Sequence, residues 1–573
     1  MGSSTPTATT TPGSRRCSSS PPRRRVSRTC WRARSPRATS ARPRTRSWSS
    51  AASASATASP GCCASSSTAA APCPTRSSST ASAAGGSSSS SVSLFRLERL
   101  TRAEIAVLRA VAAAAGRRGD PVLVGGAVRD AWLRHRPAPG ATDLDVAVPK
   151  GALDLTRRVA KRLGGAFVPL DPERGTGRVV VPGVRLDVTD FRGPTLAADL
   201  AARDFTVNAL AVSVRELVTR GRAPIVDPTG GLADLRARRL RAPGPRVLAE
   251  DPLRALRGVR LEAALALRLT PGTVAAIRAV APALAAVSVE RVRDELLAML
   301  ALPDATRAFR RADALGLLGV LLPEVEPMRA TAQPAPHRFP VLEHSLRAMA
   351  GADRVLARLA ALEPFGEELR AHMDEPLGGG VTRGPVLKLA ALLHDVAKPE
   401  TRRVVGGRVR FFEHDLVGAE RARAIGQRLR LPERAVGVLE RLVRHHLRPM
   451  HLGATDRVTP RARYRFYRDL REDTQDLLLL ALADAAAVTG ASPLRVWRHA
   501  ALIRDLLGGW EEQQAVEAAP PLLRGEDVMA RLGLSPGPAV GHLLVRVREA
   551  QALGRVGTRA EALAYLDSLS AEP

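Results

Sequence analysis

Lysine and cysteine are scarce in this chain of 573 residues, and both scarcities limit the kinds of site that the chain can form. The lysines are Lys150, Lys161, Lys388 and Lys398, so arginine supplies nearly all the positive charge. Such a bias is typical of a GC-rich coding sequence, and a single arginine is therefore weak evidence for phosphate binding. All five cysteines lie in residues 1–92, so the rest of the chain holds no disulfide framework and no thiolate metal site.

Long apolar runs are also missing. No charge-free apolar stretch reaches the roughly 18 residues that a membrane-spanning helix needs, which excludes such a helix. We expect no membrane partner, and we also expect a cytoplasmic location. Apolar residues still make up 45% of the chain, which is typical of a globular protein and excludes disorder throughout.

Acidic residues are absent from residues 1–92, a low-complexity basic segment with 13 arginines and no hydrophobic periodicity. Such a segment cannot bury a core, and we expect it to be disordered or to come from a mis-annotated start. Three interpretations are open: a basic arm, a transit-like peptide, or upstream sequence translated from a wrong start, which we favour. Of the formal charge of +30, residues 93–573 then keep +17, enough to favour RNA without specifying it.

From residue 93 onward the hydrophobic pattern predicts an α+β protein. We expect one α/β unit, with a helix at 101–116, a strand, Gly-Gly turn and helix at 121–133, a strand at 142–148, a helix at 151–164, and a hairpin of 178–181 with 184–191. After about residue 195 the pattern turns helical and stays so to the end of the chain. The plan is therefore a mixed α/β head on an all-helical body.

A glycine pair and three carboxylates form the first chemical pattern. Gly125 and Gly126 stand between a predicted strand and a helix, where backbone N–H groups can approach an anion. Asp143 and Asp145 are two apart on a strand and so face the same way, and Asp187 on the next hairpin can join them. Like charges this close are tolerable where a divalent cation bridges them, which suits two-metal nucleotidyl transfer.

Around this pattern the chain resembles a known family. The blocks GGAVRDAWL, DLD, LDVTDFR, AARDFTVNALAV, IVDPTGGLADLRARRLR and EDPLRALRGVRL follow in the order seen in class II tRNA nucleotidyltransferases and bacterial poly(A) polymerases. The resemblance implies a polymerase-β-like mixed-sheet head that uses Mg²⁺, with Asp143 and Asp145 as metal ligands and Asp187 as a third catalytic carboxylate. Ala202 stands where many members have arginine. The nucleotide-binding residues it implies are Gly125, Gly126, Arg129, Asp130, Arg203, Asp204, Asn208, Glu250, Asp251, Arg254 and Arg257.

The EDPLR block predicts nucleobase selection. We place Glu250, Asp251 and Arg254 on one helix, where Asp251 and Arg254 share a face. Their acceptors and donors match the Watson–Crick edge of adenine or cytosine, and in the resembling family such a pair selects ATP and CTP. The alternative is an acid pair near a helix N-terminus with an i,i+3 ion pair and no ligand.

A second pattern lies between residues 337 and 451, which hold eight of the eleven histidines. Charged residues such as Asp484 inside apolar helices are costly unless paired or metal-bound. The order of residues resembles the HD phosphohydrolase superfamily, with Mn, Ni, Fe, Mg or Zn as the metal. The resemblance implies His344, His394, Asp395 and Asp484 as ligands of one metal, with His414 and one of His445 and His446, for which we take His446, extending the site to a second.

This second pattern has its own alternatives. An active site would hydrolyse a phosphoester, such as a 2′,3′-cyclic or 2′-phosphate on a damaged RNA end, with Lys398 near the phosphate. The other interpretation is a degenerate HD domain kept as a helical spacer.

We therefore predict a basic segment (1–92), a nucleotidyltransferase head (93–240), a helical neck that selects the nucleobase and binds RNA (241–330), an HD domain (331–490) and a C-terminal helical RNA-binding tail (491–573). The expected function is template-independent addition of CMP and AMP, from CTP and ATP, to tRNA 3′ ends. The alternatives are a poly(A) polymerase, an A-adding or CC-adding enzyme, or an HD phosphohydrolase whose head only binds RNA. The sequence does not specify the oligomeric state.

Overall fold

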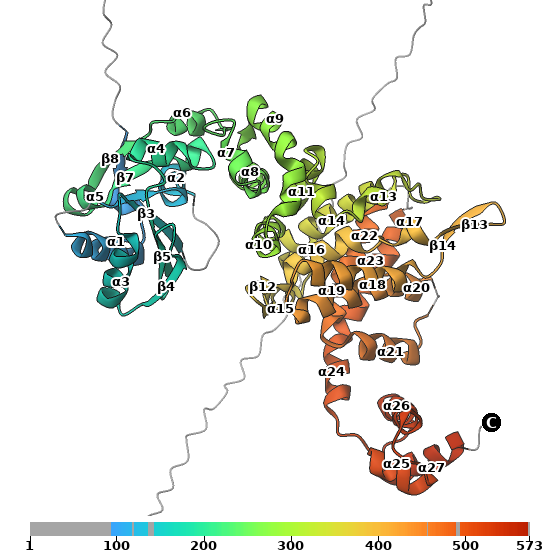
Figure 1. Ribbon diagram of the computed structural model, residues 1–573. Coiled ribbons are helices and arrows are strands. Elements are labelled where there is room, and N and C mark those ends of the chain that lie inside the picture. Colours follow the sequence, from blue (N-terminus) through green and yellow to red (C-terminus); the bar gives the residue numbers. More distant parts are fainter. Residues whose placement is uncertain (1–92, 117–119, 136–141, 455–456, 489–492, 571–573) are drawn as a thin grey trace, which may run out of the picture. The chain divides into compact units, whose positions relative to one another are not determined.

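The computed structural model describes residues 93–116, 120–135, 142–454, 457–488 and 493–570 (Figure 1). The basic segment 1–92, and the expectations attached to it, lie outside the described residues. None of the described helices is both long enough and apolar enough to cross a membrane.

The head is built on one eight-stranded sheet, in the order β1-β8-β7-β2-β3-β6-β5-β4. Strands β3 and β6 run parallel, and every other neighbouring pair in this sheet is antiparallel. This confirms the predicted mixed-sheet head. Its strands are β1 (Leu94–Arg96), β2 (Val122–Val124), β3 (Thr142–Val148), β4 (Ala166–Asp171), β5 (Thr176–Val181), β6 (Val184–Asp190), β7 (Ala211–Ser213) and β8 (Arg222–Val226).

Helices complete the head, and three of them begin at the side-chain caps Thr101, Thr195 and Ser213. Thr101 caps the first of them, accepting from the Glu104 backbone while the Glu104 side chain accepts from the Thr101 backbone. The expected helices at 101–116 and 151–164 and the hairpin around Pro182 are present with ends shifted by one or two residues. The head helices are α1 (Arg102–Ala115), α2 (Gly126–Leu133), α3 (Ala152–Leu163), α4 (Leu196–Ala201), α5 (Val214–Arg220) and α6 (Gly231–Arg236).

Alternation along β3 separates the core from the functional face. Leu144, Val146 and Val148 point into the main hydrophobic core, whereas Asp143 and Asp145 take the alternate positions. Strand β6 repeats this pattern, because Val184, Leu186 and Val188 are buried in the same core and Asp187 is not. Since the two strands are in parallel register, their acidic residues share one face of the sheet.

The prediction of helix throughout after about residue 195 is wrong. Strands β7 and β8 belong to the head sheet, where Val212 and Ile225 enter the core. They span only a few residues, and β8 contains a proline, so neither shows a measurable alternation. Three further pairs lie in the body: β9 (Arg239–Leu240) with β10 (Arg268–Leu269), β11 (Pro376–Gly378) with β12 (Val381–Thr382), and β13 (Arg402–Val405) with β14 (Arg408–Phe411).

The body is otherwise helical, as predicted. Residues 241–330 contain α7 (Val247–Glu250), α8 (Leu253–Ala264), α9 (Pro271–Val280), α10 (Val289–Leu300), α11 (Ala305–Ala314), α12 (Leu318–Leu321) and α13 (Val325–Ala330). Residues 331–490 contain α14 (Val341–Ala357), α15 (Gly366–Met373), α16 (Arg383–Leu393), α17 (Lys398–Thr401), α18 (His414–Arg428), α19 (Glu433–His445), α20 (Arg448–Leu452), α21 (Pro460–Leu470) and α22 (Thr474–Ala487). The C-terminal part contains α23 (Pro493–Gly508), α24 (Trp510–Ala518), α25 (Gly525–Leu532), α26 (Pro538–Ala552) and α27 (Arg559–Ser570).

Helix α16 is buried along its length, and a buried arginine marks its beginning. Arg383 is fully buried and donates to Asp473 at 2.7 Å, Asp476 at 2.9 Å and Glu375 at 2.7 Å. Its burial disfavours the charge, but these carboxylates outweigh that effect and raise the pKa of Arg383. The arginine thus joins α16 to the start of α22 through a buried ionic network.

The C-terminal helices α25, α26 and α27 have a hydrophobic core of their own. Val528, Val547 and Leu566 are among its buried members, and this cluster is separate from the main core. A contact with α21 runs through Glu549 on α26, which accepts from Arg465 at 2.8 Å and also from Arg461. The tail is therefore a packed unit rather than an extended arm.

Candidate functional site

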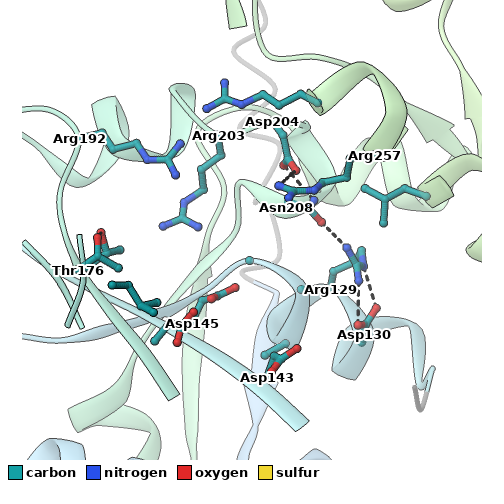
Figure 2. A pocket seen from close by; sticks show the side chains of 18 of the residues that line it. Arg129, Asp130, Asp143, Asp145, Thr176, Arg192, Arg203, Asp204, Asn208 and Arg257 are labelled. Carbon is teal, nitrogen blue, oxygen red and sulfur yellow. Dashed lines mark hydrogen bonds and ion pairs between the residues drawn. The ribbon is translucent and has the colours of Figure 1, made fainter. Parts of the chain in front are cut away.

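One cavity of about 1850 Å³ is lined by every catalytic and nucleotide-binding residue predicted in the head and the neck, and Figure 2 shows part of this lining. It extends from the functional face of the sheet to helices α7 and α8. The structure thus brings together the three carboxylates and the whole predicted nucleotide set: Asp143, Asp145, Asp187, Gly125, Gly126, Arg129, Asp130, Arg203, Asp204, Asn208, Glu250, Asp251, Arg254 and Arg257.

Asp145 stands opposite Asp187 in the register of β3 and β6. Desolvation raises the pKa of Asp145 to about 6, and Asp187 and Asp143 act in the same direction, while the Arg203 and Arg257 guanidinium groups act against this rise. A half-buried carboxylate that is this costly to ionise is stabilised by a cation beside it. The donor set therefore fits a hard divalent ion such as Mg²⁺, which prefers oxygen ligands.

Gly125 makes this arrangement sterically feasible. Its φ of +74° lies in the left-handed region, and a Cβ there would stand 2.9 Å from Oδ2 of Asp145. The next residue, Gly126, begins helix α2, whose N-terminus lines the same cavity. The Gly-Gly turn therefore lets the backbone pass close to the carboxylates while the helix end faces the cavity.

A hydrogen-bond network holds the opposite wall, as the dashed lines in Figure 2 show. Arg129 forms a two-point ion pair with Asp130 at 2.7 and 2.8 Å and donates to the side-chain oxygen of Asn208. Asn208 donates to Asp204 at 3.0 Å, and Arg257 reaches the other oxygen of Asp204 at 3.4 Å. Although burial works against its charge, Arg257 and Asn208 hold the pKa of Asp204 below its ordinary value. The network therefore keeps a fixed acceptor at the cavity wall.

Cations gather on the side of the cavity next to Arg203. Arg203 is held by Asp199 at 3.0 Å, and Arg192 donates to the carbonyl of Ala202 at 3.3 Å. Burial and repulsion from Arg203 and Arg254 lower the pKa of Arg192. The positive charge of Arg192 is therefore not fully balanced by the nearby carboxylates of Asp199 and Asp204. Such a set of arginines provides a site for an anion such as a triphosphate.

The prediction that Glu250, Asp251 and Arg254 share one helix is wrong. Helix α7 ends at Glu250, Asp251 is extended with φ −147° and ψ 95°, and α8 begins at Leu253. The cause is Pro252, because a residue that precedes proline is disfavoured in the helical conformation. The side chains still line one cavity, with the Arg254 guanidinium 4.0 Å from Asp251.

Asp251 and Arg254 are each held by a further partner. Arg291 on α10 donates to Asp251 at 2.7 Å, and Nη1 of Arg254 donates to the carbonyl of Val247 at 2.9 Å. Burial opposes the charge of Asp251, but Arg291 and Arg254 hold its pKa below the ordinary value. The pair therefore presents an ionised acceptor beside a fixed donor, which is the pattern that a nucleobase edge requires.

The second site centres on Asp395, which is buried between four imidazoles. Its Oδ2 lies 3.6 Å from Nε2 of His344 and 3.1 Å from Nε2 of His394. Its Oδ1 lies 3.5 Å from Nε2 of His414 and 3.7 Å from Nε2 of His446. One carboxylate thus faces two groups of ligand atoms.

Asp484 on α22 completes the first of these groups, 3.0 Å from His344 and 3.7 Å from His394. Two clusters of three side chains each have geometry suited to a metal ion, and together they contain all six predicted ligands of this domain: His344, His394 and Asp484, and Asp395, His414 and His446. Of the neighbouring histidines, the structure thus places His446 rather than His445 in a cluster.

The hydrogen bonds around these histidines fit metal binding. Nδ1 of His394, of His414 and of His446 each lies 2.7 to 2.9 Å from the backbone carbonyl three residues earlier. A carbonyl only accepts, so Nδ1 carries a proton, and Nε2, which faces Asp395, is the nitrogen that can bind a metal once it is deprotonated. Nε2 of His414 and of His446 is buried without a hydrogen-bond partner among the described residues. Buried groups of this kind need a partner, and a divalent cation supplies one.

Comparisons with known proteins agree with this geometry. The family described as "Poly A polymerase head domain" matches residues 122–241, the "Probable RNA and SrmB- binding site of polymerase A" matches 266–329, and the HD domain matches 341–488. An A-adding tRNA nucleotidyltransferase of Deinococcus radiodurans is 42% identical over 78% of this chain and 95% of its own length. The chain belongs to the tRNA nucleotidyltransferase family. A CC-adding member from Thermus thermophilus is 39% identical over 78% of this chain and 93% of its own length.

Solved tRNA nucleotidyltransferase structures show the same fold. A CCA-adding enzyme in an apo form has a TM-score of 0.56 at 19% identity and covers 83% of this chain and 97% of its own. The Thermotoga maritima CCA-adding enzyme, in complex with tRNA, has a TM-score of 0.53 at 19% identity over 83% of this chain and 98% of its own. The resemblance drawn from the sequence is thereby confirmed.

Several arginines that bind acidic residues of the site escaped the sequence interpretation, and two of them, Arg178 and Arg291, line the cavity. Arg178 and Arg185 bind the carboxylates of Asp187 and Asp143, and Arg291 binds Asp251. Because arginine is so abundant in this chain, an arginine carries little signal by itself. The position of Arg178 opposite Asp187 in the predicted hairpin was a signal that could have identified it.

Proposed function

We propose that this chain adds nucleotides of the CCA end, CMP from CTP and AMP from ATP, to the 3′ end of tRNA in the cytoplasm. The observation that carries the proposal is the shared cavity, where the carboxylates of β3 and β6 face the Asp251–Arg254 pair. The curated relatives, which are A-adding and CC-adding tRNA enzymes, support the substrate class.

In the proposed reaction each wall of the cavity has its own task. Asp143, Asp145 and Asp187 would hold Mg²⁺, which supplies activation of the 3′-hydroxyl and neutralisation of the leaving pyrophosphate. Arg203 and Arg192 neutralise the triphosphate and orient its α-phosphate toward the carboxylates. Asp251 accepts from the exocyclic amino group of cytosine or adenine, and Arg254 donates to the adjacent ring nitrogen. Guanine and uracil lack an amino donor at the corresponding position, which excludes GTP and UTP.

The test uses the full chain with three acceptors: tRNA lacking CCA, tRNA ending in CC, and a generic RNA. Each is supplied with CTP, with ATP, or with both, and the product lengths are read on a sequencing gel. We expect extension of the tRNAs up to CCA and no extension of the generic RNA. Addition of C alone or A alone would restrict the reaction to one part of the CCA end, and long tails on generic RNA would identify a poly(A) polymerase instead.

A second activity is supported by a separate observation, the buried Nε2 atoms without partners around Asp395. We propose that the histidine cluster holds a divalent metal and hydrolyses phosphoesters, with 2′,3′-cyclic or 2′-phosphates on damaged RNA ends as substrates. The metal, once bound, supplies a Lewis acid and a bound-water nucleophile. Lys398 lies 2.6 Å from Asp395 and so places a positive charge at the edge of the cluster, where a phosphate would approach.

Release of phosphate or ring opening of 2′,3′-cyclic AMP after loading with Mn²⁺, Ni²⁺, Fe²⁺, Mg²⁺ or Zn²⁺ tests this activity. We expect turnover with at least one metal in the unsubstituted protein. Absence of turnover with every metal, in protein that still extends tRNA, would identify a helical spacer.

A further inference from the structure

The hairpin of β13 and β14 lies in the chain between two members of the histidine cluster, Asp395 and His414, and carries an unusual set of side chains. Its strands are joined by Gly406 and Gly407, whose φ angles of +57° and +72° suit the tight two-residue turn between the paired residues Val405 and Arg408. Residues 401–412 include four arginines and no acidic residue. The hairpin is therefore a strongly basic two-stranded ribbon.

The side chains of this ribbon are open to solvent. Val404, Val405 and Phe412 are 61%, 55% and 58% exposed, which makes them some of the most exposed large apolar residues of the described chain. The arginines Arg402, Arg403, Arg408 and Arg410 are exposed as well. Solvated charge together with exposed apolar surface indicates a surface that contacts a partner.

The arginines of the ribbon differ from those around it in lacking acidic partners. Arg421 and Arg423 on the adjacent helix α18 pair with Glu400 at 2.9 Å and with Glu433 at 2.7 Å. In the described part of the chain, the ribbon arginines form no ion pair, and Arg403 donates only to the backbone carbonyls of residues 400 and 402. Their charge is therefore available for an external anion.

The register of the hairpin places like charges together. Arg403 stands directly opposite Arg410, and because Val405 is paired with Arg408, side-chain alternation puts Arg403, Arg408 and Arg410 on one face. Like charges directly opposite each other destabilise an antiparallel pair. A polyanion that binds this face removes that repulsion and gains several charge-assisted contacts at once.

The ribbon is connected directly to the histidine cluster. Its last residue, Phe411, accepts a hydrogen bond through its carbonyl from Nδ1 of His414 at 2.8 Å. The ring of Phe411 lies 5.6 Å from the ammonium of Lys398, which in turn binds Asp395. The base of the ribbon therefore lies beside the cluster, and because the register puts Phe411 on the face opposite Arg403, Arg408 and Arg410, a chain of phosphates on the arginine face would reach the cluster around this base.

We propose that the β13–β14 ribbon is an RNA-docking surface that seats a single-stranded RNA end at the histidine cluster. Arg403, Arg408 and Arg410 bind successive backbone phosphates, and Phe412 offers an exposed aromatic ring for a base to stack on. The ribbon thereby makes the cluster prefer a terminal phosphate on RNA over one on a mononucleotide. This role rests on the phosphoesterase activity proposed above, whereas the RNA contact itself does not.

The first experiment compares two substrates in the full, metal-loaded chain: 2′,3′-cyclic AMP and a single-stranded RNA of about eight nucleotides with a 2′,3′-cyclic phosphate end. In Arg408→Ala/Arg410→Ala we expect KM for the RNA to rise about tenfold at low salt, with the mononucleotide kinetics unchanged. Arg421→Ala/Arg423→Ala removes the same charge from paired arginines of the neighbouring helix and is the matched control. Equal effects of the two double variants, or equal effects on both substrates, would overturn the proposal.

The second experiment does not need turnover. The same RNA, carrying 4-thiouridine, is photocrosslinked to the unsubstituted chain, and the modified peptides are identified by mass spectrometry. We expect a crosslink within residues 402–412 that disappears in Arg408→Ala/Arg410→Ala and persists in the control. If the protein gives this crosslink but shows no phosphoesterase activity, the proposed activity is disproved and the proposed RNA contact still holds. The absence of a crosslink within residues 402–412 would disprove the RNA contact. A double variant that keeps the crosslink but loses binding to anionic vesicles would disprove it as well.

Discussion

Arg178 on β5 binds both carboxylate oxygens of Asp187 on β6, through Nε at 2.7 Å and Nη2 at 2.8 Å. The two residues are direct cross-strand partners, so the ion pair is part of the sheet rather than a chance surface contact. Asp187 therefore faces Asp145 in a fixed orientation, with one positive charge balancing part of the acidic group. Arg185 makes a similar contact with Asp143 at 2.7 Å.

Arg178→Ala should slow nucleotide incorporation by about 10–100-fold, the usual cost of losing a group that orients a metal ligand. KM for CTP and ATP should change little, because Arg178 contacts the carboxylate and not the base. Single-turnover extension of tRNA measures the effect, with Arg157→Ala, an exposed arginine of α3, as control. Full activity in Arg178→Ala would show that Asp187 needs no orientation.

Asp145→Asn should reduce incorporation by more than about 100-fold, since the amide keeps the shape of the side chain but removes the charge that a metal ligand requires. Asp154→Asn changes an exposed acid of α3 and should have no effect. If tRNA extension survives in Asp145→Asn, the carboxylates of β3 are not the catalytic group.

Gly125→Ala should abolish incorporation for a steric reason. The new Cβ would stand 2.9 Å from Oδ2 of Asp145, at a φ of +74° that a side chain rarely adopts. Gly183→Ala is a matched control, because its φ is +78° and nothing lies within 4 Å of the new Cβ. Both variants should lose about 1–2 kcal/mol of stability, measured by urea unfolding, whereas only Gly125→Ala should lose activity.

His446→Ala should lower the metal content of the purified protein and abolish hydrolysis of 2′,3′-cyclic AMP, while tRNA extension continues. His445→Ala removes an adjacent half-buried imidazole that belongs to neither metal cluster and should change neither property. Metal content is read by mass spectrometry of the acid-digested protein. Identical metal content in both variants would contradict a ligand role for His446.

Arg383→Met should destabilise the helical body by about 3–5 kcal/mol, because it leaves buried carboxylates without their cation. Asp473 and Asp476 are both fully buried, so neither can recover its charge interactions from water. Thermal unfolding followed by circular dichroism measures the loss. Arg421→Ala breaks an exposed ion pair and should cost less than about 1 kcal/mol.

The sequence predicted which side chains share one face of the sheet better than it predicted which strands pair with one another. Alternation alone placed Asp143 and Asp145 on one face, because a two-residue period does not depend on tertiary context. The parallel pairing that brings Asp187 opposite Asp145 is a long-range contact, and local pattern does not determine it. Strands β7 and β8 were missed for a related reason, since each is stabilised by its neighbours in the sheet.

At EDPLR, by contrast, the single helix was predicted wrongly although the signal against it was local. The turn is caused by Pro252, a residue that was visible in the sequence, yet the spacing of Asp251 and Arg254 was interpreted as helical. The members of the histidine cluster were easier to predict, because eight histidines within a short range of the sequence are conspicuous. The position of Asp395 between the two groups of histidines and the choice between His445 and His446 depend on how α14, α16, α18, α19 and α22 pack, which the sequence leaves open.

The separate hydrophobic core of α25, α26 and α27 divides the chain into more than one cooperative unfolding unit. Loss of packing around Val528 or Leu566 does not remove contacts from the main core, so the tail can open while the head and the histidine cluster remain folded. A single melting temperature would then describe this protein poorly. The ion pairs of Glu549 with Arg461 and Arg465 connect this tail to α21, so they determine how strongly the unfolding of the tail is coupled to that of the helical body.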